Sequence, residues 1–130
     1  MRFDTQLPAE LVEELFSFWA AIFGEDSDLS PEVFLGQEGE HNRTGVYLNR
    51  RGGNLVGTCV LMDSKRVPIL GGISAVATSP EARRSGIATE LCQQAVDDFR
   101  EGGGEAIFLG AGHPDADRIY YRLGWRKLAG

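Results

Sequence analysis

The chain has 130 residues, of which 42% are hydrophobic and 25% charged, so its length and composition are those of one globular domain spanning residues 1–130. A formal net charge of −6 argues against nucleic acid as the main partner. No apolar run has the length needed to cross a bilayer, and no basic segment leads into an apolar run at the N-terminus, so we expect a cytoplasmic protein without a membrane partner. Cys59 and Cys92 lie in apolar stretches without metal-ligand spacing, which predicts reduced, buried thiols.

Charge is unevenly distributed along the chain. Residues 1–40 hold ten acidic side chains and one basic side chain, whereas residues 41–80 hold one acid and five bases. Residues 81–130 are nearly balanced, with eight acids and seven bases. The acidic start has two interpretations: solvated faces of helices, or a field that attracts a cationic ligand.

The N-terminal third predicts helices. Residues 7–23 have an apolar stripe at helical spacing, with glutamates on the other side. Thr5 is a plausible N-cap, Pro8 fits the first turn, and Gly24 ends the helix. A shorter helix is predicted from Ser30 to about Leu35.

Strand patterns follow. Residues 45–48 and 55–62 are apolar or β-branched runs, and the turn-rich residues 50–54 between them predict an antiparallel hairpin. Residues 67–78 form a third strand region, which Ser79-Pro80 ends.

The second half alternates between helix and strand. Residues 85–100 predict the best helix of the chain, with one apolar row that faces a core. Residues 106–109 form a short, continuously apolar run, typical of a buried parallel strand, and residues 115–123 predict a last helix. This order of elements, without repeats or linkers, predicts a single α/β domain.

The segment between the third strand and the long helix has the composition of a phosphate-binding turn. A helix N-terminus offers unpaired backbone N–H groups and the positive end of the helix dipole. Gly86 and Ala88 would let a backbone approach an anion, and Arg83 and Arg84 add positive charge. The alternative is an ordinary strand-to-helix turn with surface arginines, since an R-x-x-G-x-A string is weak evidence alone.

Other nucleotide-binding motifs fit less well. The chain has no G-x-x-x-x-G-K-[ST] segment of a P-loop. Gly110-Ala111-Gly112 lacks the third glycine of a dinucleotide fingerprint and is typical of a turn after a strand.

Two segments together resemble the GNAT superfamily of acetyl-CoA-dependent N-acetyltransferases. Residues 75–91 resemble its acyl-CoA-binding motif, in which a strand and a Pro-acid pair precede [QR]-x-x-G-x-[GA] and a helix. Residues 113–125 resemble its N-x-x-A-x-x-x-Y-x-x-x-G-F segment, with His113 in place of Asn and Trp125 in place of Phe. The resemblance extends over residues 46–128 and is loose for the N-terminal helices.

The resemblance implies a GNAT-like α/β fold, a mixed sheet flanked by helices, and transfer of an acetyl group from acetyl-CoA to a primary amine by direct attack, without a metal. The acceptor would be a cationic small molecule or a peptide amine. Tyr120 would protonate the leaving thiolate, while Tyr121 would be structural. The residues implied to bind the cofactor are Val76, Ala77, Thr78, Arg83, Arg84, Ser85, Gly86, Ile87, Ala88 and His113.

The sequence leaves open the general base, whether the domain is catalytic, and what completes the sheet. No acid on residues 69–78 could act as the general base, and Asp63 and His41 are typical of solvated groups, so we assign no base. A non-catalytic acyl-CoA-binding domain of a larger protein is the alternative function. Because the resembling family continues with two more strands after its last motif, we expect a homodimer partner or a further C-terminal segment to complete the sheet.

Overall fold

The computed structural model describes residues 1–4, 6–24, 31, 34, 42–67 and 69–109. Its centre is one five-stranded sheet in which the strands lie in the order β1-β2-β3-β4-β5. All neighbouring strands are antiparallel except β4 and β5, which are parallel. The strands are β1 (Arg2–Asp4), β2 (Asn42–Arg51), β3 (Asn54–Ser64), β4 (Leu70–Thr78) and β5 (Ala106–Leu109). The predicted mixed sheet is therefore confirmed.

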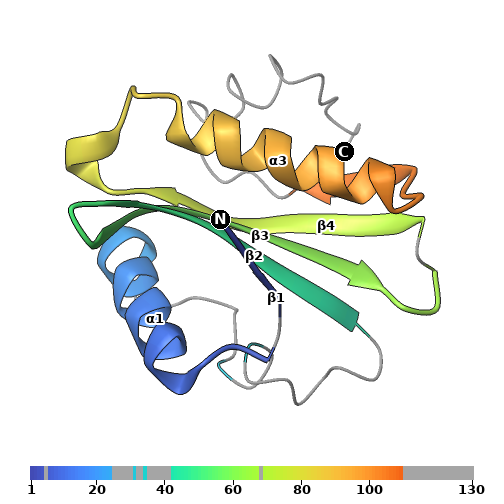
Figure 1. The fold of residues 1–130 in the computed structure, drawn as a ribbon, viewed down its shortest axis with the longest axis horizontal. Coiled ribbons are helices and arrows are strands. Elements are labelled where there is room, and N and C mark those ends of the chain that lie inside the picture. The colour runs from blue at the N-terminus through green and yellow to red at the C-terminus, as the bar shows by residue number, and fades with distance from the viewer. Residues whose placement is uncertain (5, 25–30, 32–33, 35–41, 68, 110–130) are drawn as a thin grey trace.

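Helices cover both faces of this sheet. Helix α1 (Ala9–Phe23) lies against one face and helix α3 (Ile87–Glu101) against the other (Figure 1). A short 3-10 helix, η1 (Pro80–Ala82), lies in the connection between β4 and α3. The strand-helix-strand unit β4-α3-β5 brings the parallel pair together, as such crossovers do. None of the helices in the described part of the chain is long and apolar enough to span a membrane.

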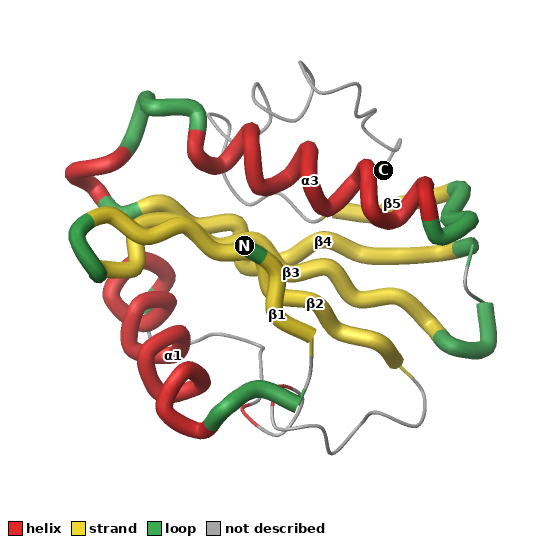
Figure 2. Tube along the Cα trace, in the orientation of Figure 1, coloured by secondary structure: helices red, strands yellow, loops and turns green. Residues whose placement is uncertain are grey.

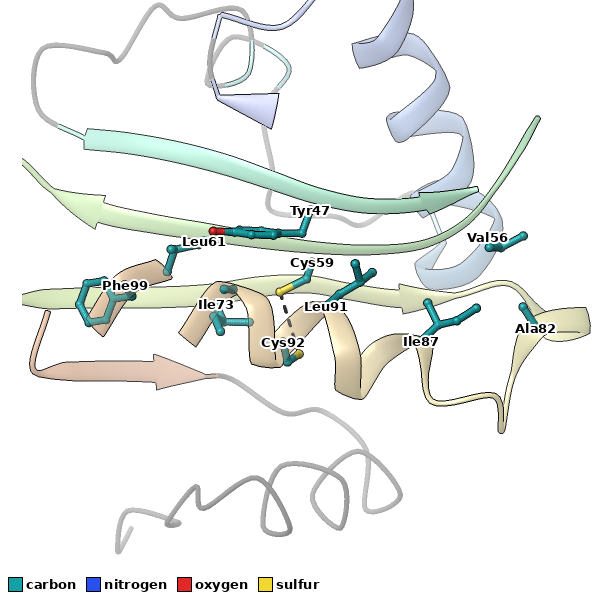
Figure 3. Packing of buried hydrophobic residues seen from close by; sticks show 11 residues of the cluster. Tyr47, Val56, Cys59, Leu61, Ile73, Ala82, Ile87, Leu91, Cys92 and Phe99 are labelled. Carbon is teal, nitrogen blue, oxygen red and sulfur yellow. Dashed lines mark hydrogen bonds between the residues drawn. The ribbon is translucent and has the colours of Figure 1, made fainter. Parts of the chain in front are cut away.

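Each helix closes its own hydrophobic cluster. The cluster under α1 includes Val12, Leu15 and Trp19, which contact apolar side chains of the sheet. The cluster under α3 combines the predicted apolar row of that helix with side chains of β2, β3 and β4 (Figure 3). The members of this row that are buried are Ile87, Leu91, Cys92, Ala95 and Phe99, so the helical pattern is confirmed.

The two cysteines face each other in the cluster under α3. Cys59 on β3 and Cys92 on α3 are both fully buried free thiols, with 4.0 Å between their sulfur atoms (Figure 3). The contact with Cys92 and burial raise the pKa of the Cys59 thiol. The prediction of buried cysteines is confirmed, and both belong to the hydrophobic cluster under α3.

Several element boundaries differ from the sequence predictions. Helix α1 starts at Ala9, with Pro8 as its N-cap in an extended conformation, while the predicted cap Thr5 lies outside the described residues. Helix α3 starts two residues later than predicted, because Gly86 takes the N-cap position. The third strand begins at Leu70 rather than Val67. Of the predicted helix at residues 30–35, Pro31 and Phe34 are described and both are helical. The predicted helix at 115–123 lies outside the described residues.

Strand β1 was not predicted, and polar contacts hold it against β2. The Arg2 guanidinium donates hydrogen bonds to the Tyr47 hydroxyl (2.9 Å) and the Asp98 carboxylate (3.1 Å). Tyr47 in turn donates to Asp98 at 2.7 Å, joining β2 to α3. Burial and this hydrogen bond raise the pKa of Tyr47 above its ordinary value, so the phenol stays protonated as a donor.

The last described strand is less buried than its apolar sequence predicts. Ile107 packs against the cluster under α3, but the side chain of Phe108 is 52% exposed. Successive side chains of a strand point to opposite faces, so only one face of β5 is covered by α3.

Candidate functional site

The described residues of β5 pair with only the first half of β4. The parallel register joins Leu70–Ile73 to Ala106–Leu109. The second half of β4, from Ser74 to Thr78, pairs with β3 on one side and with no described strand on the other. The predicted cofactor residues Val76, Ala77 and Thr78 lie on this second half, where backbone N–H and C=O groups remain for a bound molecule.

A β-bulge in β4 follows directly after the last residue that pairs with a described residue of β5. In the β3–β4 register Val60 faces Ser74 and Thr58 faces Ala77, so Ala75 and Val76 together oppose the single residue Cys59. Ala75 has a left-handed backbone with φ 49°, which is unusual for a residue other than glycine. After the bulge Val76 packs toward α3 and Ala77 toward α1. The bulge therefore sets which face each following residue of β4 presents.

The loop from Ser79 to Gly86 has a backbone that suits an anion. Arg84 and Gly86 both have left-handed conformations, with φ 65° and 79°. Gly86 is the N-cap of α3, and no side chain caps the helix. Its carbonyl accepts the first helical hydrogen bond, from the Glu90 N–H at 2.9 Å, so the N–H groups of the first turn point toward the loop. Figure 2 shows this loop at the end of α3 opposite the start of β5.

Side chains of the loop divide into structural and exposed ones. The Ser85 hydroxyl donates to the Ala82 carbonyl and stabilises the turn. Ile87 is buried in the core, so only its backbone can serve a ligand, whereas Ala88 is half-buried. Arg83 and Arg84 are exposed, and neither forms an ion pair with a carboxylate of the described residues. Arg83 only donates a long hydrogen bond, 3.4 Å, to the Thr78 carbonyl.

Two features of the neighbourhood were not predicted. The Ser79 hydroxyl, at the start of the loop, is the one buried side-chain polar atom of the described residues without a hydrogen-bond partner. Gly57 on β3 allows a close approach of α3, since a Cβ atom there would lie 2.3 Å from Cγ2 of Ile87. The sequence marks Ser79-Pro80 as the end of a strand, but it does not show that the Ser79 side chain is buried, because burial depends on the fold.

Of the other residues considered in the sequence, the structure describes only Asp63. Asp63 forms an ion pair with Arg43, with 2.7 Å between the nitrogen and oxygen atoms, so it is not a free base. His41, His113 and Tyr120 lie outside the described residues, and their roles stay predictions. Within the described part, no three His, Cys, Asp or Glu side chains gather as a metal site would require.

Comparison with solved structures gives the same fold. An acetyltransferase of the GNAT family from Staphylococcus aureus matches with a TM-score of 0.71 at 17% identity, over 99% of this chain and 87% of that one. The ribosomal-protein alanine N-acetyltransferase of Escherichia coli matches with a TM-score of 0.72 at 15% identity, over 99% and 80%. An aminoglycoside acetyltransferase from an uncultured soil metagenomic sample matches with a TM-score of 0.68 at 15% identity, over 100% and 91%.

The sequence itself identifies the family. No curated protein matches the chain. The model of the acetyltransferase (GNAT) family, however, matches residues 9–125, which is most of the chain and includes both segments singled out above. Because this match extends over more than half of the chain, the chain belongs to the GNAT family of acetyltransferases.

Proposed function

We propose that this protein transfers an acetyl group from acetyl-CoA to a primary amine. Membership of the GNAT family supports acyl transfer from an acyl-CoA, and the choice of acetyl-CoA and of an amine is our proposal. The observation that carries it is the arrangement of the open half of β4 beside the uncapped N-terminus of α3. A strand edge can bind an extended pantetheine arm, and a helix N-terminus can bind its pyrophosphate.

The residues present fit such a ligand. The Gly86 position has no heavy atom within 4 Å of where a Cβ would lie, so the backbone is open to an approaching phosphate. Arg83 and Arg84 are exposed beside it, available for the pyrophosphate oxygens.

The proposed reaction makes one bond and breaks one. Acetyl-CoA supplies an activated thioester carbonyl, and the amine nitrogen attacks its carbon while the carbon–sulfur bond breaks. A backbone N–H of β4 near Val76 would donate to the carbonyl oxygen as negative charge develops there. Tyr120 would give its proton to the thiolate, and the amine would lose its own proton to water.

We further propose that the acceptor is a cationic amine. The net charge of −6 and the ten acids of residues 1–40 favour a positively charged partner. Two proteins of the same fold are named for such acceptors, an aminoglycoside in one case and a ribosomal-protein alanine in the other. At 15% identity these structural matches support only the fold. The proposed acceptor class of this chain therefore rests on its charge.

A non-catalytic acyl-CoA-binding domain is the competing function. The observation that favours it is the ion pair of Asp63 with Arg43, because this carboxylate was one of the two groups considered for the general base and it is already paired. This alternative keeps the binding site and loses only turnover.

Calorimetry and a thiol-release assay together test the proposal. We expect acetyl-CoA to bind with one site per chain, and a panel of primary amines to include one that releases free CoA thiol. Binding without turnover on any amine would favour the non-catalytic domain. No binding of acetyl-CoA at all would refute both functions.

We also propose a cytoplasmic location, because Cys59 and Cys92 are free thiols rather than a disulfide. Cell fractionation would test this. The expected homodimer, or further segment that completes the sheet, stays a prediction for light scattering over a concentration series, and a mass of one chain at every concentration would contradict the homodimer.

A further inference from the structure

A buried chain of hydrogen bonds connects helix α1 to the bulge in β4. The indole N–H of Trp19 donates to the Thr58 hydroxyl oxygen at 2.9 Å. The Thr58 hydroxyl donates in turn to the Ala75 carbonyl oxygen at 2.8 Å. Trp19 and Thr58 are both almost completely buried, with exposures of 1% and 0%. Three elements, α1, β3 and β4, are thus joined through one hydroxyl group.

The acceptor of this chain is the strained residue of the bulge. Ala75 holds a left-handed φ of 49°, a conformation that persists in L residues only where the surroundings impose it. Ordinary strand pairing would not impose it, because the β3–β4 register breaks at this point. The hydrogen bond from Thr58 fixes the direction of the Ala75 carbonyl and so supplies the constraint.

The same bond fixes the next N–H group. The Ala75 carbonyl and the Val76 N–H belong to one planar trans peptide, so they point in opposite directions. With the carbonyl held toward Thr58 on β3, the Val76 N–H points away from β3. Among the described residues, β5 pairs with β4 only as far as Ile73, so this N–H lies on the half of β4 that has no described partner on that side.

We propose that Thr58 and Trp19 are positioning residues that aim the Val76 N–H at the thioester carbonyl oxygen. This inference rests on the proposed function, because it concerns the donor that would polarise acetyl-CoA. Thr58 acts directly on the Ala75–Val76 peptide. Trp19 holds the Thr58 hydroxyl so that its single proton is directed at Ala75, since the indole N–H occupies a lone pair of the oxygen.

A purely structural role is the alternative. A buried tryptophan needs an acceptor for its N–H, and Thr58 would serve as that acceptor whether or not the site used the bulge. Trp19 also packs edge-on against Phe16, with 5.2 Å between ring centroids, so α1 has other contacts to hold it. The two roles differ in their effect on bound acetyl-CoA: only the positioning role makes the hydrogen bond to the thioester carbonyl oxygen depend on Thr58.

The deciding measurement is the infrared carbonyl band of acetyl-CoA labelled with carbon-13 in the acetyl group. A hydrogen bond to the oxygen lowers the stretching frequency, so the wild-type complex should show a shift to lower frequency relative to free acetyl-CoA. Thr58→Val has nearly the same shape but no hydroxyl, and we expect it to lose this shift while the Kd for acetyl-CoA changes less than about threefold. With the acceptor found in the amine screen, kcat should fall about 10- to 100-fold with little change in KM.

Three further variants make the test specific. Thr58→Ser keeps the hydroxyl and should restore both the band shift and kcat. Thr44→Val removes the hydroxyl of another buried threonine of the same sheet, on β2, which does not pair with β4, and should change neither. If Thr58→Val does not fold because the Trp19 N–H lacks an acceptor, the double variant Trp19→Phe/Thr58→Val removes that donor and takes its place.

The outcomes separate this inference from the proposed function. A wild-type protein that binds acetyl-CoA and shifts its carbonyl band, with the same shift in Thr58→Val, overturns the positioning role alone. Equal losses in Thr58→Val and Thr44→Val also overturn it, since they indicate a general effect on the sheet. If the wild-type protein does not bind acetyl-CoA, or binds it without a band shift, the proposed polarisation fails, and the positioning role fails with it.

Discussion

Gly86 ends the proposed pyrophosphate loop in a left-handed conformation with φ 79°. We expect Gly86→Glu to weaken acetyl-CoA binding by roughly 100-fold or more, because a carboxylate would stand where the phosphates approach the helix N-terminus. Calorimetry with acetyl-CoA measures the change. Unchanged affinity in a folded variant would remove the loop from the cofactor site.

Backbone strain has to be separated from this effect. Gly103, at the other end of α3, has φ 92° and is equally open around its Cβ position. Gly103→Glu therefore adds the same side chain at a similar backbone strain, which costs about 1 kcal/mol. It should lower the thermal midpoint about as much as Gly86→Glu does and leave acetyl-CoA binding intact.

Tyr120 is assigned as the general acid from the sequence resemblance alone. Tyr120→Phe removes the proton that the thiolate needs, so kcat should fall by roughly 100- to 10,000-fold while the affinity for acetyl-CoA is kept. Tyr121→Phe is the matched control, expected to keep full turnover. Full activity of Tyr120→Phe on the true acceptor would return that tyrosine to a packing role.

At the scale of single residues, the loop was predictable and the bulge was not. The run from Arg83 to Ala88 has side-chain and glycine signals that suit a phosphate turn, although Gly86 is the N-cap of α3 and not, as predicted, a residue inside the helix. Ala75 gives no such signal, because alanine in a strand predicts an extended backbone. Its carbonyl accepts a hydrogen bond from Thr58, seventeen residues away in the chain, a contact that no local pattern reveals.

The packing of α3 on β3 determines where the helix N-terminus lies. Gly57→Ala would place a Cβ atom 2.3 Å from Ile87, the first residue of α3, so the helix start must move or the core must repack. Such overpacking costs about 1–3 kcal/mol. We expect lower stability in chemical denaturation and, because the anion-binding N–H groups move with the helix, weaker binding of acetyl-CoA.

The control for this variant lies at the other end of the same helix. A Cβ atom at Gly104 would also lie 2.3 Å from a neighbour, the Phe99 ring near the C-terminus of α3. Gly104→Ala should destabilise the fold without affecting the cofactor loop. Equal losses of affinity in the two alanine variants would mean that stability alone, and not the position of the helix start, governs binding.

Elements with strong periodicity were predicted well, and those defined by pairing were not. The apolar row of α3 repeats along four turns, and the structure buries it as predicted. Strand β2 extends to Asn42 and Arg51, beyond the apolar residues 45–48, because β3 pairs with the polar ends as well. Strand β1 has three residues and depends on β2 for its hydrogen bonds, so no local pattern reveals it.

For the whole molecule, the net charge of −6 bears on the acceptor. If an acidic field attracts a cationic amine, KM for the acceptor should rise several-fold as ionic strength increases from about 0.05 M to about 0.5 M, because salt screens the attraction. The value of kcat should stay constant. Steady-state kinetics over a salt series would show this, and a KM that ignores ionic strength would contradict the acceptor class.

Variants in which acidic side chains are replaced by neutral ones test which acids attract the cationic amine. The segment Glu25-Asp26-Ser27-Asp28 lies outside the described residues, and two of its three acids can be neutralised as Glu25→Gln with Asp26→Asn. The matched control is Glu10→Gln with Glu13→Gln, on exposed positions of α1. A larger rise of KM in the first set than in the control would support a local role of residues 25–28, whereas equal effects would favour the solvated-helix interpretation.

The long-range pairing of β1 also bears on the order in which the strands fold. Strands β2, β3 and β4 pair with their sequence neighbours through short turns, so their closure costs little chain entropy. Strand β1 pairs across the whole of α1, since Arg2 faces Tyr47. The N-terminal strand is therefore expected to join the sheet late in folding and to leave it first. In native-state hydrogen exchange its amides would open at a free energy below that of global unfolding, while β3, paired on both sides, would exchange last.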